Sequence, residues 1–506
     1  MSTIYTAKIT RSNLSVRIKT VEVFSKNVIL GSMNKNILII SLVSSFLMVQ
    51  TGCKNDGFRV QSIAKTKSSD PKKGKDNLPT KMPPNVPPAE VTPVVDNPTP
   101  APAPVTIASN PTPTPVSTPA PTPIELQKGT KTILANSKAF AALKNNGAVI
   151  TWGASTEGGD STKVANQIKS DVKLIASTGK AFAALKENGQ VITWGAGNEG
   201  GDSSDFALAL KSAVQSIVGN QSSFAAVKKD GSVVTWGVRE TGGDSIKVSA
   251  ELNSNVKSIS KTSTAFAALK IDGSVVTWGS SNEGGNSSSV AVQLKSGVQS
   301  IVGGEFAFAA LKNDGSVITW GQSEFGADQS KVASQLSSGV KSVTAADASF
   351  AALKVDGSVI TWGKDEDGGD HTEVADQLKS GVKTIIANSR SFAALKSDGN
   401  IVTWGQAWTG GDSSSVSEQL KSNTVSVVSN GRAFAAVRKD GSVVTWGDQF
   451  GGGDPLDAAD QLKSGVQTVI GCWGVFFAIK TNGAVITWGE PLQSVAFSKI
   501  QDQLAL

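Results

Sequence analysis

The sequence predicts an all-β protein made of nine stacked three-stranded sheets. A Thr-Trp-Gly motif recurs nine times at an unbroken spacing of 42 residues, the first with Trp152 and the last with Trp488. Every copy also carries the strand-like runs FAALK and VVTWG or close variants, joined in most copies by Asp-Gly or Asn-Gly. Self-similarity at a fixed period of this size is the signature of a repeat architecture, in which each repeat is one small structural unit.

The composition excludes several other classes of protein. The chain has 506 residues with 51 Gly, and it lacks the apolar stretches of a mainly helical or multi-span membrane protein. A single histidine, His371, leaves little material for His-based metal sites or for Ser–His and Cys–His catalysis. Two cysteines allow at most one disulfide, which excludes a disulfide-built scaffold.

Each element of the unit follows from its residues. The unit reads GVKSI, then five variable residues, xFAALKxDGSVVTWG, four variable residues, and GGDSxxVAxQLKS. Nine such units fill residues 129–506. VKSI, FAALK and VVTWG predict three short strands, and Asp-Gly predicts a hairpin with a type I′ turn. Both faces of VVTWG are apolar, which favours sheets stacked face to face. VAxQL predicts one helical turn, with the preceding Asp-Ser as its N-cap.

These strings resemble the repeats of the regulator of chromosome condensation family. The resemblance rests on FAALKNDGSVITWG (308–321) and GVKSV (339–343) and covers residues 129–506. It implies a β-propeller, although family members typically have seven blades and longer units. Nine units close as one ring in the interpretation we favour, because the end units are little altered and an open array needs polar caps. A seven-plus-two arrangement and an open superhelix are the alternatives.

The N-terminal region predicts export. Residues 33–53 combine a Lys near a Met, an apolar run and a small-residue ending at Cys53, as in a secretory signal. The ending Thr-Gly-Cys is similar to a bacterial lipoprotein processing box, so we expect Cys53 to carry the lipid; ordinary cleavage and an uncleaved anchor are the alternatives. Residues 1–32 are expected to be an over-extended gene start. The protein is therefore expected at a bacterial membrane, in the outer membrane or at the cell surface.

A proline-rich stretch follows the signal. Residues 54–128 contain runs such as PTPAPAP and are expected to form a disordered, extended tether. The net charge of +6 is also concentrated near the N-terminus, because residues 1–128 hold 15 Lys and Arg against 7 Asp and Glu. The repeat region is close to neutral, which argues against nucleic acid as a partner.

The nine copies differ mainly in two short stretches, one before FAALK and one after TWG. If successive strands run up, down and up, both stretches lie at one rim, which is then the diversified surface. The odd residues of this rim are aromatics in units five and seven to nine and acids in unit six. They are Phe306, Phe325, Asp347, Asp365, Glu366, Asp367, Trp408, Phe450 and Trp473.

Aromatics beside charged residues are typical of a protein-binding surface. We therefore predict a non-enzymatic protein that binds another protein through this rim, and the resemblance agrees, since the family includes a secreted β-lactamase inhibitor that holds its target through rim loops. The opposing interpretation is that each aromatic folds back over its own blade. Carbohydrate binding is an alternative because Trp and Phe also stack on sugars, and carboxylate-based glycan cleavage at the acids of unit six is another.

We expect no metal, cofactor or catalytic residue. The recurring Gly-Gly-Asp supplies too few oxygens at one point for calcium, so the aspartates are expected to serve turns and caps. His371 replaces the usual Ser of this motif in unit six and is expected to be a solvated loop residue. Cys472, beside Trp473, is expected to be a small, partly buried residue.

Overall fold

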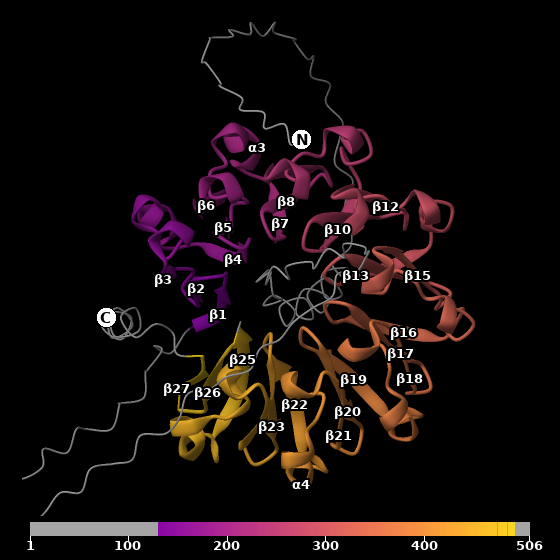
Figure 1. Cartoon of the computed structure of the whole chain (residues 1–506). Coiled ribbons are helices and arrows are strands. Elements are labelled where there is room, and N and C mark those ends of the chain that lie inside the picture. Colours follow the sequence, from indigo (N-terminus) through magenta and orange to yellow (C-terminus); the bar gives the residue numbers. More distant parts are fainter. Residues whose placement is uncertain (1–129, 473, 483, 491–506) are drawn as a thin grey trace, which may run out of the picture. The chain divides into compact units, whose positions relative to one another are not determined.

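The computed structural model describes residues 130–472, 474–482 and 484–490. The predicted signal segment, Cys53, the tether and Trp473 lie outside these residues. The described part is nearly all-β and contains nine three-stranded antiparallel sheets, which confirms the predicted fold class. Figure 1 shows the sheets following one another in sequence order around a common centre.

The three strands of each sheet follow one another in the sequence and pair in that order. The first strands lie innermost and the third strands outermost (Figure 1). The first strands are β1 (Thr130–Ala135), β4 (Val172–Ser177), β7 (Val214–Gly219), β10 (Val256–Lys261), β13 (Val298–Gly303), β16 (Val340–Ala345), β19 (Val382–Ala387), β22 (Thr424–Ser429) and β25 (Val466–Cys472). The second strands are β2 (Ala139–Lys144), β5 (Ala181–Lys186), β8 (Ser223–Lys228), β11 (Ala265–Lys270), β14 (Ala307–Lys312), β17 (Ser349–Lys354), β20 (Ser391–Lys396), β23 (Ala433–Arg438) and β26 (Val475–Lys480). The third strands are β3 (Val149–Gly153), β6 (Val191–Gly195), β9 (Val233–Gly237), β12 (Val275–Gly279), β15 (Val317–Gly321), β18 (Val359–Gly363), β21 (Ile401–Gly405), β24 (Val443–Gly447) and β27 (Val485–Gly489).

Two short helical turns follow the third strand in sheets one to eight. The first turns are η1 (Ser155–Glu157), η3 (Gly197–Glu199), η5 (Arg239–Thr241), η7 (Ser281–Glu283), η10 (Ser323–Phe325), η12 (Asp365–Asp367), η14 (Ala407–Thr409) and η16 (Gln449–Gly453). The second turns are η2 (Thr162–Val164), η4 (Ser204–Phe206), η6 (Ile246–Val248), η8 (Ser288–Val290), η11 (Ser330–Val332), η13 (Thr372–Leu378), η15 (Ser414–Val416) and η17 (Leu456–Leu462). Some continue into α2 (Ala165–Ile168), α3 (Ala207–Leu210), α4 (Ser417–Leu420) or η9 (Gln293–Lys295). The predicted helical turn is therefore present.

The core lies between neighbouring sheets. In the first sheet, residues 130–153, the first five residues of the second strand are all buried. They are covered on one face by the next sheet, where Ala141 and Leu143 join Ile175 and Trp194 in one cluster. In units one to eight, the helical segment adds an apolar side chain to this junction, such as Ile168, which is 1% exposed. Burial on both faces, predicted from VVTWG, is complete in the second strand but only partial in the third, as in β12, where Trp278 alone is buried.

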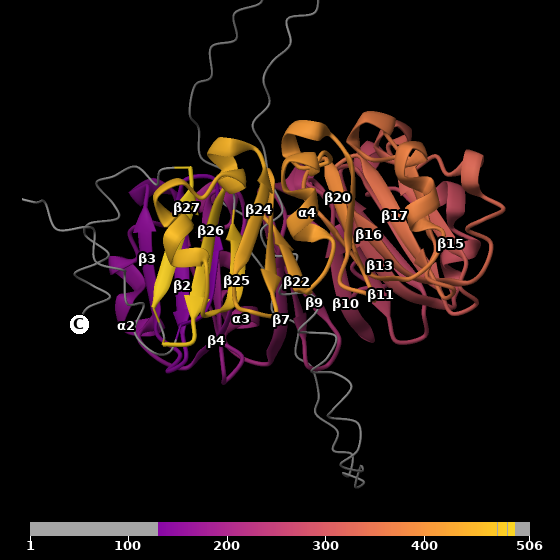
Figure 2. The same cartoon turned by 90° about the horizontal axis from the view of Figure 1, so that it is seen from below.

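The first and ninth sheets also contact each other. β1 lies against β25, and the thiol of Cys472 donates to the carbonyl oxygen of Ile133 at 3.4 Å. Ile133, Phe140 and Trp152 share a core cluster with Cys472 and Phe477. Figure 2 shows the sheets side by side from a second direction. Closure of the array as a single ring stays a prediction, which a thiol-labelling experiment in the Discussion tests.

The hairpin turns differ from the prediction. Gly147 has a φ of 79°, but neither Asn145 nor Asn146 has a positive φ, whereas a type I′ turn needs two positive values. The N–H of Lys144 donates to the carbonyl of Ala148 and that of Gly147 to the carbonyl of Lys144, which makes a three-residue connection with Gly in the left-handed position. The predicted type I′ turn is wrong, because the Asx side chain instead accepts the N–H of residue 148 at 3.0 Å.

Candidate functional site

The two variable stretches meet at one rim, as predicted. In the first sheet, the N–H of Ala154, just after the third strand, donates to the carbonyl of Lys138 at 2.9 Å, just before the second strand. Asn136 donates from Nδ2 to the carbonyl of Glu157 at 2.6 Å, which ties the two loops together. We call the surface formed by residues 136–138 and 154–158 and their equivalents in the other units the loop rim. The opposite end, with the three-residue turns, is called the turn face.

The loop rim is held by a side-chain latch that the sequence prediction placed within a variable stretch. At the position of Asn136, five other units have Asn or Thr, whose side chains donate to the following loop in the same way, whereas units five, six and nine have Gly304, Ala346 and Cys472. The donors are Asn136, Thr178, Asn220, Thr262, Asn388 and Asn430. The recurrence of Asn or Thr at this position in six of the nine units was the sequence signal, and it marks a structural residue inside a loop that otherwise varies.

Backbone hydrogen bonds join the rim loops of successive sheets. The N–H of Ser137 donates to the carbonyl of Gly179 in the next sheet at 3.1 Å, and the same bond recurs along the rim. The further pairs are Gly179–Gln221, Gln221–Ser263, Ser263–Glu305, Glu305–Asp347 and Asp347–Ser389. Asp347, a predicted binding residue, is thus half-buried and part of this chain of bonds.

In several units, two rim positions hold complementary side chains. Lys138 pairs with Glu157 at 3.6 Å, and Lys180 pairs with Glu199 at 2.8 Å. In unit five the same two positions are Phe306 and Phe325, whose rings meet edge to face with centroids 4.7 Å apart. Both rings are only partly exposed, and Phe325 packs against the core between sheets five and six. These two aromatics therefore fold over their own blade and replace an ion pair.

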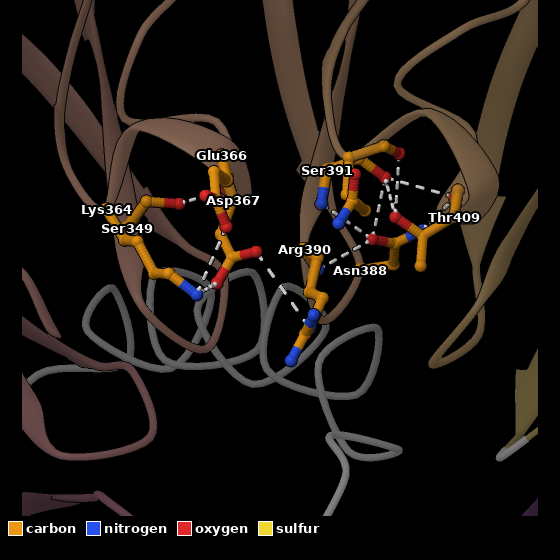
Figure 3. A network of polar contacts seen from close by, with 9 residues as sticks. Ser349, Lys364, Glu366, Asp367, Asn388, Arg390, Ser391 and Thr409 are labelled. Atoms are coloured by element: carbon orange, nitrogen blue, oxygen red, sulfur yellow. Dashed lines mark hydrogen bonds and ion pairs between the residues drawn. The ribbon is translucent and has the colours of Figure 1, made fainter. Parts of the chain in front are cut away.

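The acidic residues of unit six differ in how exposed they are. Asp365 and Glu366 are exposed, whereas Asp367 is 3% exposed. The carboxylate of Asp367 lies 3.4 Å from the ammonium of Lys364 and 3.9 Å from Arg390 of the next sheet. Figure 3 shows Asp367 between these two cations, with Asn388, Ser391 and Thr409 forming the adjacent latch. Asp367 thus joins two sheets, since a buried carboxylate requires such partners.

Trp408 and Phe450 remain exposed at the rim. Trp408 is 49% exposed and Phe450 is 71% exposed. They occupy the same position in units seven and eight, where units one to six have Thr, Asn, Glu, Asn, Glu and Glu. The loop that carries Phe450 is ordered by Asp448, whose carboxylate accepts the N–H of Phe450 at 3.1 Å. Two large aromatic side chains are thus presented to solvent on consecutive sheets.

A fixed cation lies next to the loop that carries Phe450, since the carbonyl of Arg432 accepts the N–H of Asp448. Arg432 lies 2.6 Å from Glu490 and 3.6 Å from Asp448, so carboxylates on two sides orient its guanidinium. Its side chain is about one third exposed. Aromatic residues and Arg are the residue types that most often carry the binding energy of protein interfaces. We call Trp408, Phe450 and Arg432 the aromatic patch.

The Gly-Gly-Asp aspartates serve the helical turns. Asp160 accepts the N–H of Thr162 at 2.9 Å, and this bond lowers the pKa of Asp160 below its usual value. The equivalent bond recurs in the other described copies, for example from Ser204 to Asp202. The residue after the aspartate, predicted as part of the cap, behaves differently: the hydroxyl of Ser161 bonds Thr151 at 2.8 Å instead of capping the turn.

His371 is not a solvated loop residue, so this expectation is wrong. Its Nδ1 lies 2.7 Å from the hydroxyl of Thr361, where other units place a Ser hydroxyl against the same Thr. Burial lowers the pKa of His371, opposed by the nearby charge of Asp370. Across the described ranges, 130–472, 474–482 and 484–490, no group of three His, Cys, Asp or Glu side chains converges as a metal site would require. Cys472 is fully buried at the contact with the first sheet.

Comparison with known proteins finds no matching protein family and no matching curated protein. Solved structures do match. Yeast RCC1 (Prp20), from the family that the repeats resemble, is 17% identical over 67% of this chain and 84% of its own, with a TM-score of 0.35. Human WBSCR16 is 14% identical over 47% of this chain and 78% of its own, with a TM-score of 0.33. The ectodomain of the Arabidopsis thaliana receptor kinase ACR4 is 13% identical, covering 62% and 94%, with a TM-score of 0.31.

Proposed function

We propose that this chain is a non-enzymatic binding protein that holds a protein partner at the aromatic patch of its loop rim. The observation that carries the proposal is the exposure of Trp408 and Phe450 at one repeated position on consecutive sheets. Covering a Phe side chain fully contributes about 1.5–3 kcal/mol, so two such side chains can supply the centre of an interface. Phe306, Phe325 and Asp367, by contrast, fold onto their own blade or pair across sheets and serve the scaffold.

The order of the scaffold supports this proposal. Latches from Asn388 and Asn430 fix the loops that carry Trp408 and Phe450, and a backbone bond from Asp347 to Ser389 joins unit six to unit seven. A surface that is already ordered loses less conformational entropy when it binds. The patch also includes Arg432, and Arg is a residue type that often carries binding energy in protein interfaces.

The test is a comparison of capture by two variants. The chain from Lys54 onward keeps every described sheet, and it is used to capture proteins from the surroundings of the producing cell. We expect Trp408→Ala with Phe450→Ala to lose a specific partner, whereas Phe306→Ala with Phe325→Ala keeps it, because the second pair is turned onto its own blade. Equal capture by wild type and the first variant, with both folded, contradicts the proposal.

Carbohydrate binding is the second candidate, and the exposed ring of Trp408 favours it. Binding of the same variants to a glycan array separates the two candidates. Affinity for a glycan that depends on Trp408, in the absence of a captured protein partner, supports carbohydrate binding. Glycan cleavage at unit six is tested by turnover assays with Asp365→Asn and Glu366→Gln. Asp367 is not a candidate for glycan cleavage, because its carboxylate is already paired with Lys364 and Arg390.

The proposal includes attachment to a bacterial membrane through Cys53, at the outer membrane or cell surface. The Thr-Gly-Cys ending of the predicted signal and the proline-rich stretch after it support this part. Within the described residues, no helix is long and apolar enough to cross a bilayer. Mass spectrometry of the mature N-terminus tests the anchor: a lipid-modified Cys53 supports it, and an unmodified cysteine in the producing cell contradicts it.

A further inference from the structure

The turn face carries a ring of lysines that the proposed function does not use. Each first strand begins with a register shift that leaves one extra residue near its start, as between Thr130 and Thr132. This extra residue is Lys in five units, Gln in three and Val in one, and it is never acidic. The nine are Lys131, Lys173, Gln215, Lys257, Gln299, Lys341, Lys383, Val425 and Gln467.

The array places these nine positions at one end. The carbonyl of each turn glycine accepts the N–H at the start of the next unit's first strand, as from Val172 to Gly147 and from Val214 to Gly189. Lys131 also reaches from its ammonium to the carbonyl of Lys173 at 3.2 Å, so neighbouring positions lie within side-chain reach. The innermost strands contact one another in sequence, and the lysines therefore surround the centre of the array.

The two ends of the array differ in how their cations are paired. At the loop rim, Lys138, Lys180 and Arg432 each stand within 4 Å of a carboxylate. At the turn face, none of the five lysines forms a salt bridge with any described residue. Clustered like charges without partners repel one another, and an anionic ligand removes that cost.

A second set of cations lies at the same end. The last residue of every second strand is Lys or Arg, and several of these donate to the helical segment of the preceding unit, as from Lys186 to the carbonyl of Gln167 at 2.9 Å. A carbonyl partner leaves the positive charge in place. The turns also contribute aspartates such as Asp314, but Ser316 occupies that carboxylate through its N–H and its hydroxyl. Each turn supplies at most one acid, and Asp376, Glu418 and Asp460 of the helical segments are paired with Lys379, Lys421 and Lys463, so cations outnumber acids at this end.

Apolar side chains are interspersed with these lysines. Ile271 and Val355, in two of the turns, are 71% and 76% exposed, and Val425 at the extra-residue position is 53% exposed. Lysines mixed with exposed aliphatic side chains are typical of surfaces that lie on a membrane interface. The positive groups are spread over the whole face rather than gathered around one point, which fits a flat, multivalent partner.

The N-terminal end of β1 also lies at this face. Thr130 begins β1 and is paired with Lys144 at the end of β2, next to the turn. The 129 residues before it, which include the predicted tether and Cys53, therefore join the array at its turn face. We propose that the turn face binds a membrane surface through anionic phosphate headgroups. This contact orients the loop rim, with the aromatic patch, away from the lipid.

The experiment measures binding of the chain from Lys54 onward to phosphatidylcholine vesicles with and without phosphatidylglycerol. Each lysine near an anionic surface strengthens binding roughly fivefold. We therefore expect Lys257→Gln, Lys341→Gln and Lys383→Gln together to weaken binding to the anionic vesicles at least about 20-fold. Gln is the residue at this position in units three, five and nine, so the variant is expected to fold.

A matched variant controls for net charge. Lys163→Gln, Lys247→Gln and Lys331→Gln remove the same charge from exposed sites in the segments after the third strands, and we expect binding within about twofold of wild type. Equal weakening by both triple variants, or no binding to anionic vesicles, overturns the proposal. Binding to soluble inorganic polyphosphate but not to vesicles also overturns it, in favour of a free phosphate ligand. Trp408→Ala with Phe450→Ala keeps vesicle binding, which separates this proposal from the proposed function.

Discussion

Trp194 donates its indole N–H to the carbonyl oxygen of Gly158, 3.0 Å away in the preceding unit. The same bond joins each further pair of neighbouring sheets up to Trp488 and Gly452. The Trp of one unit and the first Gly of the Gly-Gly pair of the unit before it thus form a single lock. Within the described residues, the indole nitrogen of Trp152 has no hydrogen-bond partner.

Replacement of the lock glycine is expected to destabilise the array. Gly200 has a φ of +95°, and a Cβ there would lie 2.6 Å from the ring of Phe224. We expect Gly200→Ala to lower the free energy of unfolding by about 2 kcal/mol or more, because it adds backbone strain to a clash in the core. Gly197→Ala, three residues earlier at an exposed site where a Cβ would meet only Asp202 at 3.5 Å, is the control and is expected to change stability by less than about 0.5 kcal/mol. Urea denaturation measures both; similar losses contradict the account.

The pairing of Phe306 with Phe325 is testable by a double-mutant cycle. Edge-to-face aromatic pairs contribute about 0.5–1.5 kcal/mol beyond their buried area. We expect a coupling energy in that range between Phe306→Ala and Phe325→Ala, measured by chemical denaturation. The Trp408 and Phe450 pair is expected to show a coupling energy near zero, since both rings face solvent. Zero coupling in the first pair means that the rings do not meet in solution.

His371 is expected to make stability depend on pH. Burial lowers its pKa from 6.5, so the unfolded chain takes up a proton at a higher pH than the folded chain. The stabilisation is therefore present above pH 6.5 and is lost as pH falls below that value toward the folded pKa. His371→Ser introduces the residue that unit seven has at Ser413. We expect this variant to show a thermal stability that depends less on pH in this window. An unchanged slope contradicts this assignment.

Ring closure is expected to protect Cys472 from thiol reagents. The thiol is fully buried where the first and ninth sheets meet, so a closed array exposes it only when that contact opens. In a chain with Cys53→Ser, we expect Cys472 to react far more slowly than a cysteine introduced by Val425→Cys, which is an exposed position. Labelling of both sites at similar rates indicates an open array, with the face of the ninth sheet uncovered.

The repeat predicted more of the scaffold than of the site. Period and strand pattern predicted the nine sheets, because both depend on local residue order and on burial of both faces. The partner of each Trp was not predictable, since Trp194 and Gly158 lie in different units and only the packing of sheets brings them together. The turn type was wrong because Asn146 bonds its own turn. Phe306 and Phe325 could not be separated from Trp408 and Phe450, because variability marks a loop without showing which side chains face inward.

Site-specific photocrosslinking tests the central claim most directly. A photoreactive amino acid is placed at position 408 in the aromatic patch and, as a control, at position 355 in the turn face, both exposed in the structure. The account predicts a defined protein adduct from position 408 in the producing cell's surroundings and none of the same mass from position 355. An adduct of equal yield from both positions, or a protein adduct from position 355 alone, would contradict the claim that the loop rim is the protein-binding surface.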